Sequence, residues 1–301
     1  MRKLTLLFLY LCLVIITPAA FSQSPTKLWY DRPAQFFEET LVLGNGKMGA
    51  TIFGGAQSDK IYLNDATLWT GEPVNANMSP EAYKNLPAIR EALKDENYPL
   101  AEKLNRKLQG TFSQSYAPLG TMYINTTHSD RIKNYYRELD LQKAVSKVSY
   151  EVDGIKYTRS YFISYPDQVM VIKLTSSRKA SLSFSLTFNS QLKNQVVVKN
   201  KTLIANGYAP VHADPSYRKN DKDPVRFVEN RGTRFSTMYK IKNNGGQLIL
   251  TDSTIGVKNA TEAVIYVSIA TSFNGATKNP ATDGLNNAAI AATNLKKALA
   301  K

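Results

Sequence analysis

Apolar and polar side chains alternate through much of the second half of the chain. Val148, Tyr150 and Val152 alternate with polar residues, then Asp153-Gly154 interrupts the run, and the alternation resumes behind it. An Asp-Gly pair between two alternating runs is the strongest short-range signal for a β-hairpin. We therefore predict a hairpin that turns at Asp153-Gly154.

Further runs with a period of two residues follow, and turn residues separate them. The predicted strands are Gln168–Thr175, Leu182–Asn189, Gln195–Ala205, Arg234–Asn243, Gln247–Thr251 and Ala263–Ser272. Strands spaced in this way favour a large antiparallel sandwich. The predicted fold class is therefore all-β dominated, a large β-sandwich or super-sandwich. The polar segment Tyr208–Arg231 is too long for a hairpin turn, and loops of that length often have a function.

The period changes to that of a helix between Ser79 and Gln109, where apolar residues recur every three or four positions. Ser79 before Pro80 is typical of an N-cap followed by proline in the first turn. Asn97 restarts the pattern, and Gly110 is a candidate C-cap. These signals predict a helical hairpin inserted into the β domain.

The first residues have the pattern of a secretory signal peptide. Arg2 and Lys3 precede the apolar run Leu4–Ile16, and small residues up to Ser22 predict cleavage before Gln23. The run is short for a membrane span, which needs roughly 20 residues. A retained N-terminal anchor is the alternative interpretation. We predict a secreted or periplasmic protein with no membrane span after signal cleavage.

Composition and charge argue against disulfides, thiolate metal sites and nucleic-acid binding. Cys12, the single cysteine of the 301 residues, lies inside the predicted signal, so we expect neither disulfides nor thiolate metal sites in the mature chain. The formal net charge is +14, but no run of five like charges occurs. Scattered lysines favour a solvated basic surface over a nucleic-acid site. Attraction to acidic glycans or anionic cell surfaces is the alternative that this balance leaves open.

The segment Leu41–Pro73 is the most informative part of the sequence. Its glycines are dense, and Gly44-Asn45-Gly46 predicts a tight turn between two short apolar runs. Ile61–Leu63 then reads as a strand with a polar exit that contains Trp69. This pattern resembles the N-terminal domain of glycoside hydrolase family 95, the inverting α-L-fucosidases and their relatives.

Other blocks carry the same resemblance in the same order, from about Leu28 to Phe273. They are Ala117-Pro118-Leu119-Gly120 with Tyr123, Tyr136–Leu141, Val145–Tyr165, Pro166–Val169, Gly232–Phe235 and Ala270–Phe273. The chain departs from the family pattern at Ala66, which stands in the block Asn64–Trp69 where an aspartate is common. Glu72 replaces a usual glycine, and Thr121 stands where an acidic residue is common.

The resemblance implies a β-sandwich domain, a helical linker, an (α/α)6 catalytic barrel and a small β domain. Residues 1–22 are then the signal peptide, 23–285 the β-sandwich domain, and 286–301, which are Ala-rich and helical in pattern, the start of the linker. No position matches the catalytic motifs of the family, so no catalytic residue is assigned. We expect a missing downstream catalytic domain, and fucosylated glycans as the carbohydrate partner.

Glu138 and Asp140 are the best local pair of carboxylates. Residues two apart in an extended segment point to one face, and an inverting glycosidase needs two carboxyl groups roughly 6.5–9.5 Å apart. The alternative is structural: the pair binds Arg137 or caps the edge of a strand.

Asp65 and Glu72 flank Trp69, an arrangement suited to sugar binding. The aromatic face can pack against C–H groups while the carboxylates accept hydrogen bonds from hydroxyls. The alternative is a buried tryptophan that anchors the turn. His128 and His212 are far apart in sequence, so we predict surface histidines, no metal site and no cofactor.

Two functions follow. The first is the N-terminal domain of a secreted glycoside hydrolase, an inverting α-L-fucosidase, inactive without its barrel. The second is a stand-alone secreted carbohydrate-binding or structural β-sandwich module, favoured by Trp29 and Trp69 beside polar loops.

Overall fold

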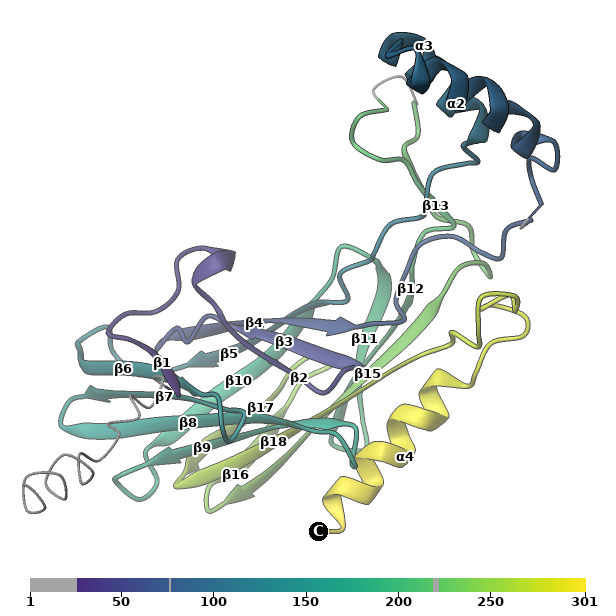
Figure 1. Ribbon diagram of the computed structural model, residues 1–301. Coiled ribbons are helices and arrows are strands. Elements are labelled where there is room, and N and C mark those ends of the chain that lie inside the picture. Colours follow the sequence, from purple (N-terminus) through teal and green to yellow (C-terminus); the bar gives the residue numbers. More distant parts are fainter. Residues whose placement is uncertain (1–25, 76, 219–221) are drawn as a thin grey trace, which may run out of the picture.

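The computed structural model describes residues 26–75, 77–218 and 222–301, so the predicted signal peptide lies outside the described residues. Two antiparallel sheets, of nine and seven strands, pack face to face and confirm the predicted all-β sandwich (Figure 1). No helix among the described residues is both long and apolar enough to cross a membrane.

The nine-stranded sheet has the order β1-β6-β7-β8-β9-β18-β15-β12-β11. Its strands are β1 (Lys27–Tyr30), β6 (Ile132–Asp140), β7 (Val145–Val152), β8 (Ile155–Ser164), β9 (Val169–Ser176), β18 (Glu262–Thr271), β15 (Arg234–Asn244), β12 (Thr202–Tyr208) and β11 (Lys193–Lys199). The seven-stranded sheet has the order β16-β17-β10-β5-β4-β3-β2. Its strands are β16 (Gln247–Leu250), β17 (Ile255–Ala260), β10 (Leu182–Asn189), β5 (Gly120–Thr126), β4 (Ser58–Asp65), β3 (Met48–Ile52) and β2 (Leu41–Gly44).

The core lies between the two sheets, where alternate residues of each strand point inward. Ile61 and Leu63 of β4 are buried, as are Met122 of β5 and Ile172 of β9. The residues between them face outward, because side chains alternate between the two faces of a strand. This alternation sets which side chains of β4 and β5 are available on the outer face of the seven-stranded sheet.

The predicted turns are confirmed, and one predicted strand is wrong. Asp153 and Gly154 join β7 to β8 with φ values of +51° and +74°. The segment predicted as one strand, Gln195–Ala205, is instead the hairpin β11–β12. Asn200 and Lys201 both adopt positive φ there, and lysine gives no sequence signal for such a turn. The strands β1, β5 and β17 are not among the predicted ones.

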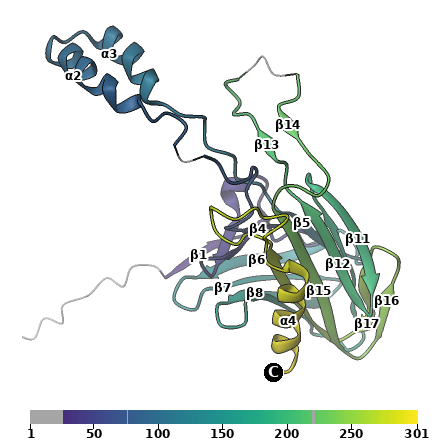
Figure 2. The same cartoon turned by 90° about the vertical axis from the view of Figure 1, so that its right-hand side faces the viewer.

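The helical insertion lies between β4 and β5, as expected, but begins later. The 3-10 turn η2 (Ala82–Asn85) precedes α2 (Leu86–Lys94), and α3 (Tyr98–Asn105) ends in the turn η3 (Arg106–Leu108). Ser79 is not an N-cap of α2: its backbone carbonyl accepts from Ala82 N. Asn97 caps α3, its Oδ1 accepting from Leu100 N. The helical hairpin and the small hairpin of β13 (His212–Ala213) and β14 (Val225–Arg226) project from the same end of the sandwich (Figure 2).

The predicted C-terminal helix is α4 (Asn287–Leu299), which begins at the cap Asn286. Ala291 and Leu295 pack on Met238 and Ala270, on the outer face of the nine-stranded sheet. The helix is therefore attached to β15 and β18 rather than free of the sandwich (Figure 1).

Candidate functional site

Asp65 ends β4 and closes the turn that follows it. Its side chain is fully buried, and its Oδ1 accepts hydrogen bonds from the backbone N and the Oγ1 of Thr67, at 2.9 and 2.6 Å. Its Oδ2 lies 2.8 Å from Lys47 Nζ. The carboxylate is therefore occupied by the turn and by one lysine.

Trp69 lies on the segment that leaves the sandwich toward the helical hairpin. Its Nε1 donates to the Ala66 carbonyl at 3.0 Å, and its ring meets Tyr116 edge to face, 6.2 Å between centroids. The residue is nevertheless 45% exposed. The turn thus fixes the orientation of the indole and leaves part of its surface free for a ligand.

Glu72 and Arg231 link two segments at this end of the sandwich, the one that follows Trp69 and the one that precedes β15. Arg231 forms an ion pair with Glu72, with Arg231 Nε 3.2 Å from each carboxylate oxygen. Hydrogen bonding from Arg231 lowers the pKa of Glu72 below its ordinary value. The carboxylate is therefore ionised near neutral pH, and its ion pair with Arg231 holds the two segments together. This ion pair is the Arg231 clamp.

Trp69 and Glu72 line one hollow of about 370 Å³, and Asp65 does not. Its lining also includes Met78, Phe112, Thr233 and Phe273. Of the three residues that the sequence grouped, the structure therefore brings two together, in a mainly apolar hollow with one clamped carboxylate.

Glu138 and Asp140 lie two apart on β6, at the edge of the sheet next to β1. Lys27 Nζ lies 3.1 Å from Glu138, and the Tyr136 hydroxyl donates to it at 2.8 Å. Asp140 accepts from the backbone N of Gln142 and of Lys143, at 3.1 and 3.0 Å. Both carboxylates therefore hold local structure, and neither lines the hollow beside Trp69.

The histidines have aromatic and polar partners. His128 packs between Tyr150 and Tyr157, and burial lowers its pKa. His212 Nε2 lies 3.1 Å from Asp214 Oδ1. Across the described residues, no three side chains of the His, Cys, Asp and Glu types are grouped as a metal site would require.

Two clusters were missed by the sequence reasoning. The first is buried between the sheets: Asp59, Arg159 and Tyr161, with Arg159 Nη1 3.0 Å and Tyr161 Oη 2.5 Å from Asp59 Oδ2. Their only sequence signal is that Asp59 occupies an inward position in the alternation of β4. All three side chains are at most 2% exposed, so the cluster joins the sheets and is closed to a ligand.

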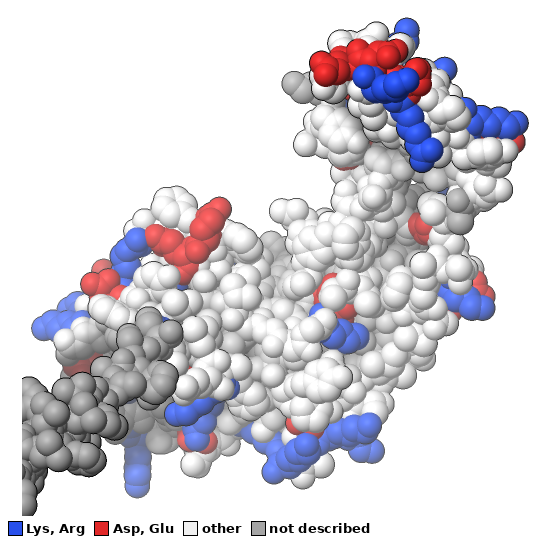
Figure 3. Space-filling model, in the orientation of Figure 1, with Lys and Arg blue, Asp and Glu red and all other residues white. Residues whose placement is uncertain are grey.

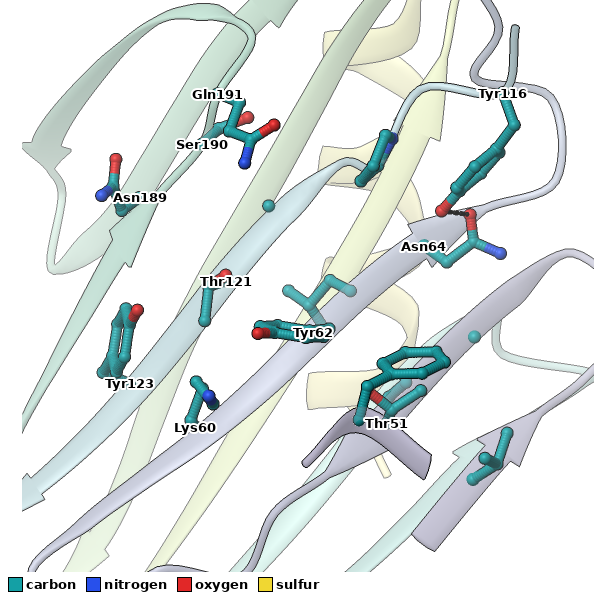
Figure 4. A pocket seen from close by; sticks show the side chains of 17 residues that line it. Thr51, Lys60, Tyr62, Asn64, Tyr116, Thr121, Tyr123, Asn189, Ser190 and Gln191 are labelled. Carbon is teal, nitrogen blue, oxygen red and sulfur yellow. Dashed lines mark hydrogen bonds between the residues drawn. The ribbon is translucent and has the colours of Figure 1, made fainter. Parts of the chain in front are cut away.

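The second cluster without a sequence signal lines a hollow of about 870 Å³ on the outer face of the seven-stranded sheet. Tyr62, Thr121 and Tyr123 contribute to its floor, and Asn189 and Gln191 to its rim (Figure 4). The alternation of β4 and β5 predicts which of these side chains face outward. It does not show that they lie side by side.

Comparison with known proteins places this architecture in a family. Residues 28–276 match the family described as "Glycosyl hydrolase family 65, N-terminal domain". "Alpha-L-fucosidase 2" of Arabidopsis thaliana is 31% identical over 262 residues, covering 83% of this chain and 31% of that protein. "Probable alpha-fucosidase A" of Aspergillus oryzae is 26% identical over 262 residues, covering 85% of this chain and 35% of that protein.

A solved structure described as "Putative kojibiose phosphorylase from human microbiome" aligns over 92% of this chain and 36% of its own, with a TM-score of 0.46 and 11% identity. The chain spans about a third of the length of the two curated relatives named above. The family match covers most of the described sandwich. The chain therefore belongs to the family of glycosyl hydrolase family 65 N-terminal domains.

Proposed function

We propose that this chain is the N-terminal domain of a secreted glycoside hydrolase of family 95, an α-L-fucosidase that acts on glycans by inversion. The observation that carries the proposal is the match of residues 28–276 to a glycoside hydrolase N-terminal domain, together with two relatives named as fucosidases. In this proposal a downstream barrel performs the chemistry, and the sandwich supports it.

The contacts of Asp65, Glu138 and Asp140 support the assignment of the chemistry to the barrel rather than to the sandwich. An inverting mechanism needs one protonated carboxyl group and one carboxylate that activates a water molecule between them. Asp65 is buried in a turn, while Glu138 and Asp140 are engaged by Lys27 and by a backbone turn. Groups of the sandwich itself therefore engage each of these three carboxylates.

The first experiment is an activity assay. We expect purified residues 23–301 to fold and to leave an aryl α-L-fucoside unhydrolysed, because general acid–base catalysis contributes roughly 10²–10⁴-fold. In this proposal, turnover should emerge in a longer protein that joins this chain to a catalytic barrel. Turnover by the short chain that Glu138→Gln or Asp140→Asn abolishes would overturn the proposal and place the active site in the sandwich.

A second candidate function is a stand-alone carbohydrate-binding module, and the half-exposed Trp69 beside a hollow favours it. Binding on a glycan array that Trp69→Ala abolishes, with the far-ultraviolet circular dichroism unchanged, would support this candidate. The matched control is Trp29→Ala, since Trp29 is also exposed but stacks on Tyr136 at the far edge of the other sheet.

A further inference from the structure

The large hollow on the seven-stranded sheet is built from a row of outward side chains that crosses five neighbouring strands. Strand pairing aligns Val42 with Thr51, Thr51 with Tyr62, Tyr62 with Thr121, and Thr121 with Asn189. Four interstrand spacings of about 4.8 Å make this row about 19 Å long. The hollow is therefore elongated across the strands.

Aromatic rings stand in and around this row. Phe37 stacks on Tyr62, 6.2 Å between centroids, and Tyr123 lies beside the row, opposite Lys60 on the neighbouring strand. Tyr116 stands to the side of the row, beside Asn64, where its hydroxyl donates to Asn64 Oδ1 at 2.6 Å (Figure 4). A hydrogen bond and a ring stack thus fix two of the rings before any ligand arrives.

Several polar side chains of the same hollow, among the residues that the structure describes, have no hydrogen-bond partner in the protein. Among the described residues, the hydroxyls of Tyr62, Thr121 and Tyr123 and the amides of Asn189 and Gln191 make no side-chain hydrogen bond. Hydroxyls and amides both donate and accept. The floor therefore offers donors and acceptors in alternation with apolar ring surface.

The charge of the lining is low. No carboxylate and no guanidinium line the hollow, and Lys60 is its one ammonium group among the described residues. Lys60 Nζ lies 3.8 Å from the centre of the Phe53 ring and 5.3 Å from that of Tyr62, so the rings already engage it. The lining therefore suits an uncharged ligand better than an ionic one.

We propose that this hollow binds a neutral oligosaccharide laid across strands β2, β3, β4, β5 and β10. A sugar chain presents hydroxyls that can pair with the free hydroxyls and amides, and C–H faces that can pack on tyrosine rings. The volume of about 870 Å³ lies within the range of small-molecule sites and exceeds the need of one sugar unit. The inference goes beyond the proposed hydrolase function, because it depends on the lining and on no catalytic step.

The test is isothermal titration of the purified chain with cellotetraose, maltotetraose and 2′-fucosyllactose, with tetragalacturonate as the charged counterpart. We expect at least one neutral probe to bind at micromolar to millimolar concentration, more tightly than tetragalacturonate. Tyr123→Ala should weaken binding at least tenfold. Thr121→Val and Tyr123→Phe, which remove one hydroxyl each, should weaken it about three- to tenfold, because a hydrogen bond contributes about 1 kcal/mol.

Tyr165→Ala is the matched control, since Tyr165 is 72% exposed and lies outside the hollow. It should leave the affinity unchanged. Thermal melting of each variant separates loss of binding from loss of folding, and the two hydroxyl deletions keep the assay informative if Tyr123→Ala unfolds. The inference is overturned by binding of tetragalacturonate alone, by binding that Trp69→Ala but no hollow variant reduces, or by no heat with any neutral probe. Absence of fucoside hydrolysis by the protein with its barrel would count against the proposed hydrolase function and would leave the inference of oligosaccharide binding unaffected.

Discussion

At the scale of single residues, the buried charges of this protein hold its two sheets together. Arg159 reaches across the core from β8, donating to the Gly55 and Ala56 carbonyls at 2.7 and 2.9 Å and pairing with Asp59 of β4. Asp59 also accepts from Gly54 N at 2.8 Å. These contacts join the nine-stranded sheet to the irregular turn between β3 and β4.

Asp59→Asn should be among the most destabilising single changes. Removing one partner of a buried pair leaves the other charge uncompensated, which costs about 3–5 kcal/mol. Equilibrium urea unfolding measures this loss. The matched control is Glu91→Gln, because the pair of Glu91 with Lys94 is exposed and should contribute less than about 1 kcal/mol. Similar losses for both variants would contradict the structural role of the buried pair.

Glu72 should give the stability a component that depends on pH. Its pKa is lowered in the folded protein, so the Arg231 clamp stabilises the fold above the ordinary glutamate pKa of 4.5 and is lost as pH falls through the folded value. We expect Glu72→Gln to cost about 0.5–1 kcal/mol at pH 7. The difference from the parent chain should shrink below pH 4.5. Denaturant unfolding from pH 7 to pH 3 measures it.

Glu102→Gln serves as the control for that experiment. Glu102 and Arg106 form a pair on α3 in which both side chains are 72% exposed, so its removal should have little effect at any pH. A loss for Glu72→Gln that stays constant across the pH range would argue against the clamp.

At the scale of elements, the β7–β8 turn depends on left-handed backbone conformations. Gly154 has a φ of +74°, and a Cβ placed on it would meet no atom within 4 Å. Substitution there therefore changes backbone strain without a clash. Gly154→Val should cost roughly 1–2 kcal/mol, whereas Gly154→Asn should cost clearly less, because asparagine tolerates positive φ. Thermal or urea unfolding of the pair measures the difference, and equal losses would refute the explanation.

At the scale of the whole molecule, the basic residues are dispersed. Figure 3 shows lysines and arginines separated by acidic and uncharged side chains, and a largely uncharged surface where the sandwich meets the projecting segment. Dispersed charges are screened over about 8 Å at physiological ionic strength. The net charge of +14 therefore does not concentrate into a nucleic-acid surface on the face shown.

We accordingly expect no retention of duplex DNA by the purified chain at about 0.15 M salt, with any weak binding at low salt falling steeply as salt rises. Filter binding across a salt series measures this. Retention of DNA at physiological salt would contradict this expectation. A salt dependence of the binding constant that indicates several phosphate contacts would then show that the fold clusters the lysines on one surface.

The sequence by itself determined the strands whose pattern is local. Leu182–Asn189 was predicted with the bounds that β10 has, and Asp153-Gly154 located the β7–β8 turn, because alternation and turn chemistry depend on adjacent residues. The turn at Asn200-Lys201 is different. A turn built on a lysine with positive φ has no local signal, so two strands were read as one.

Only the tertiary structure decided how the side chains are used. Asp65, Glu138 and Asp140 looked like candidates for chemistry, and their roles follow from Lys47, Lys27 and a backbone turn respectively. The hollow on the seven-stranded sheet unites residues from positions 37 to 191. Strand order and register between distant segments decide both which groups contact these carboxylates and which side chains line the hollow. The period of two residues in the sequence determines only which face of the sheet a side chain takes.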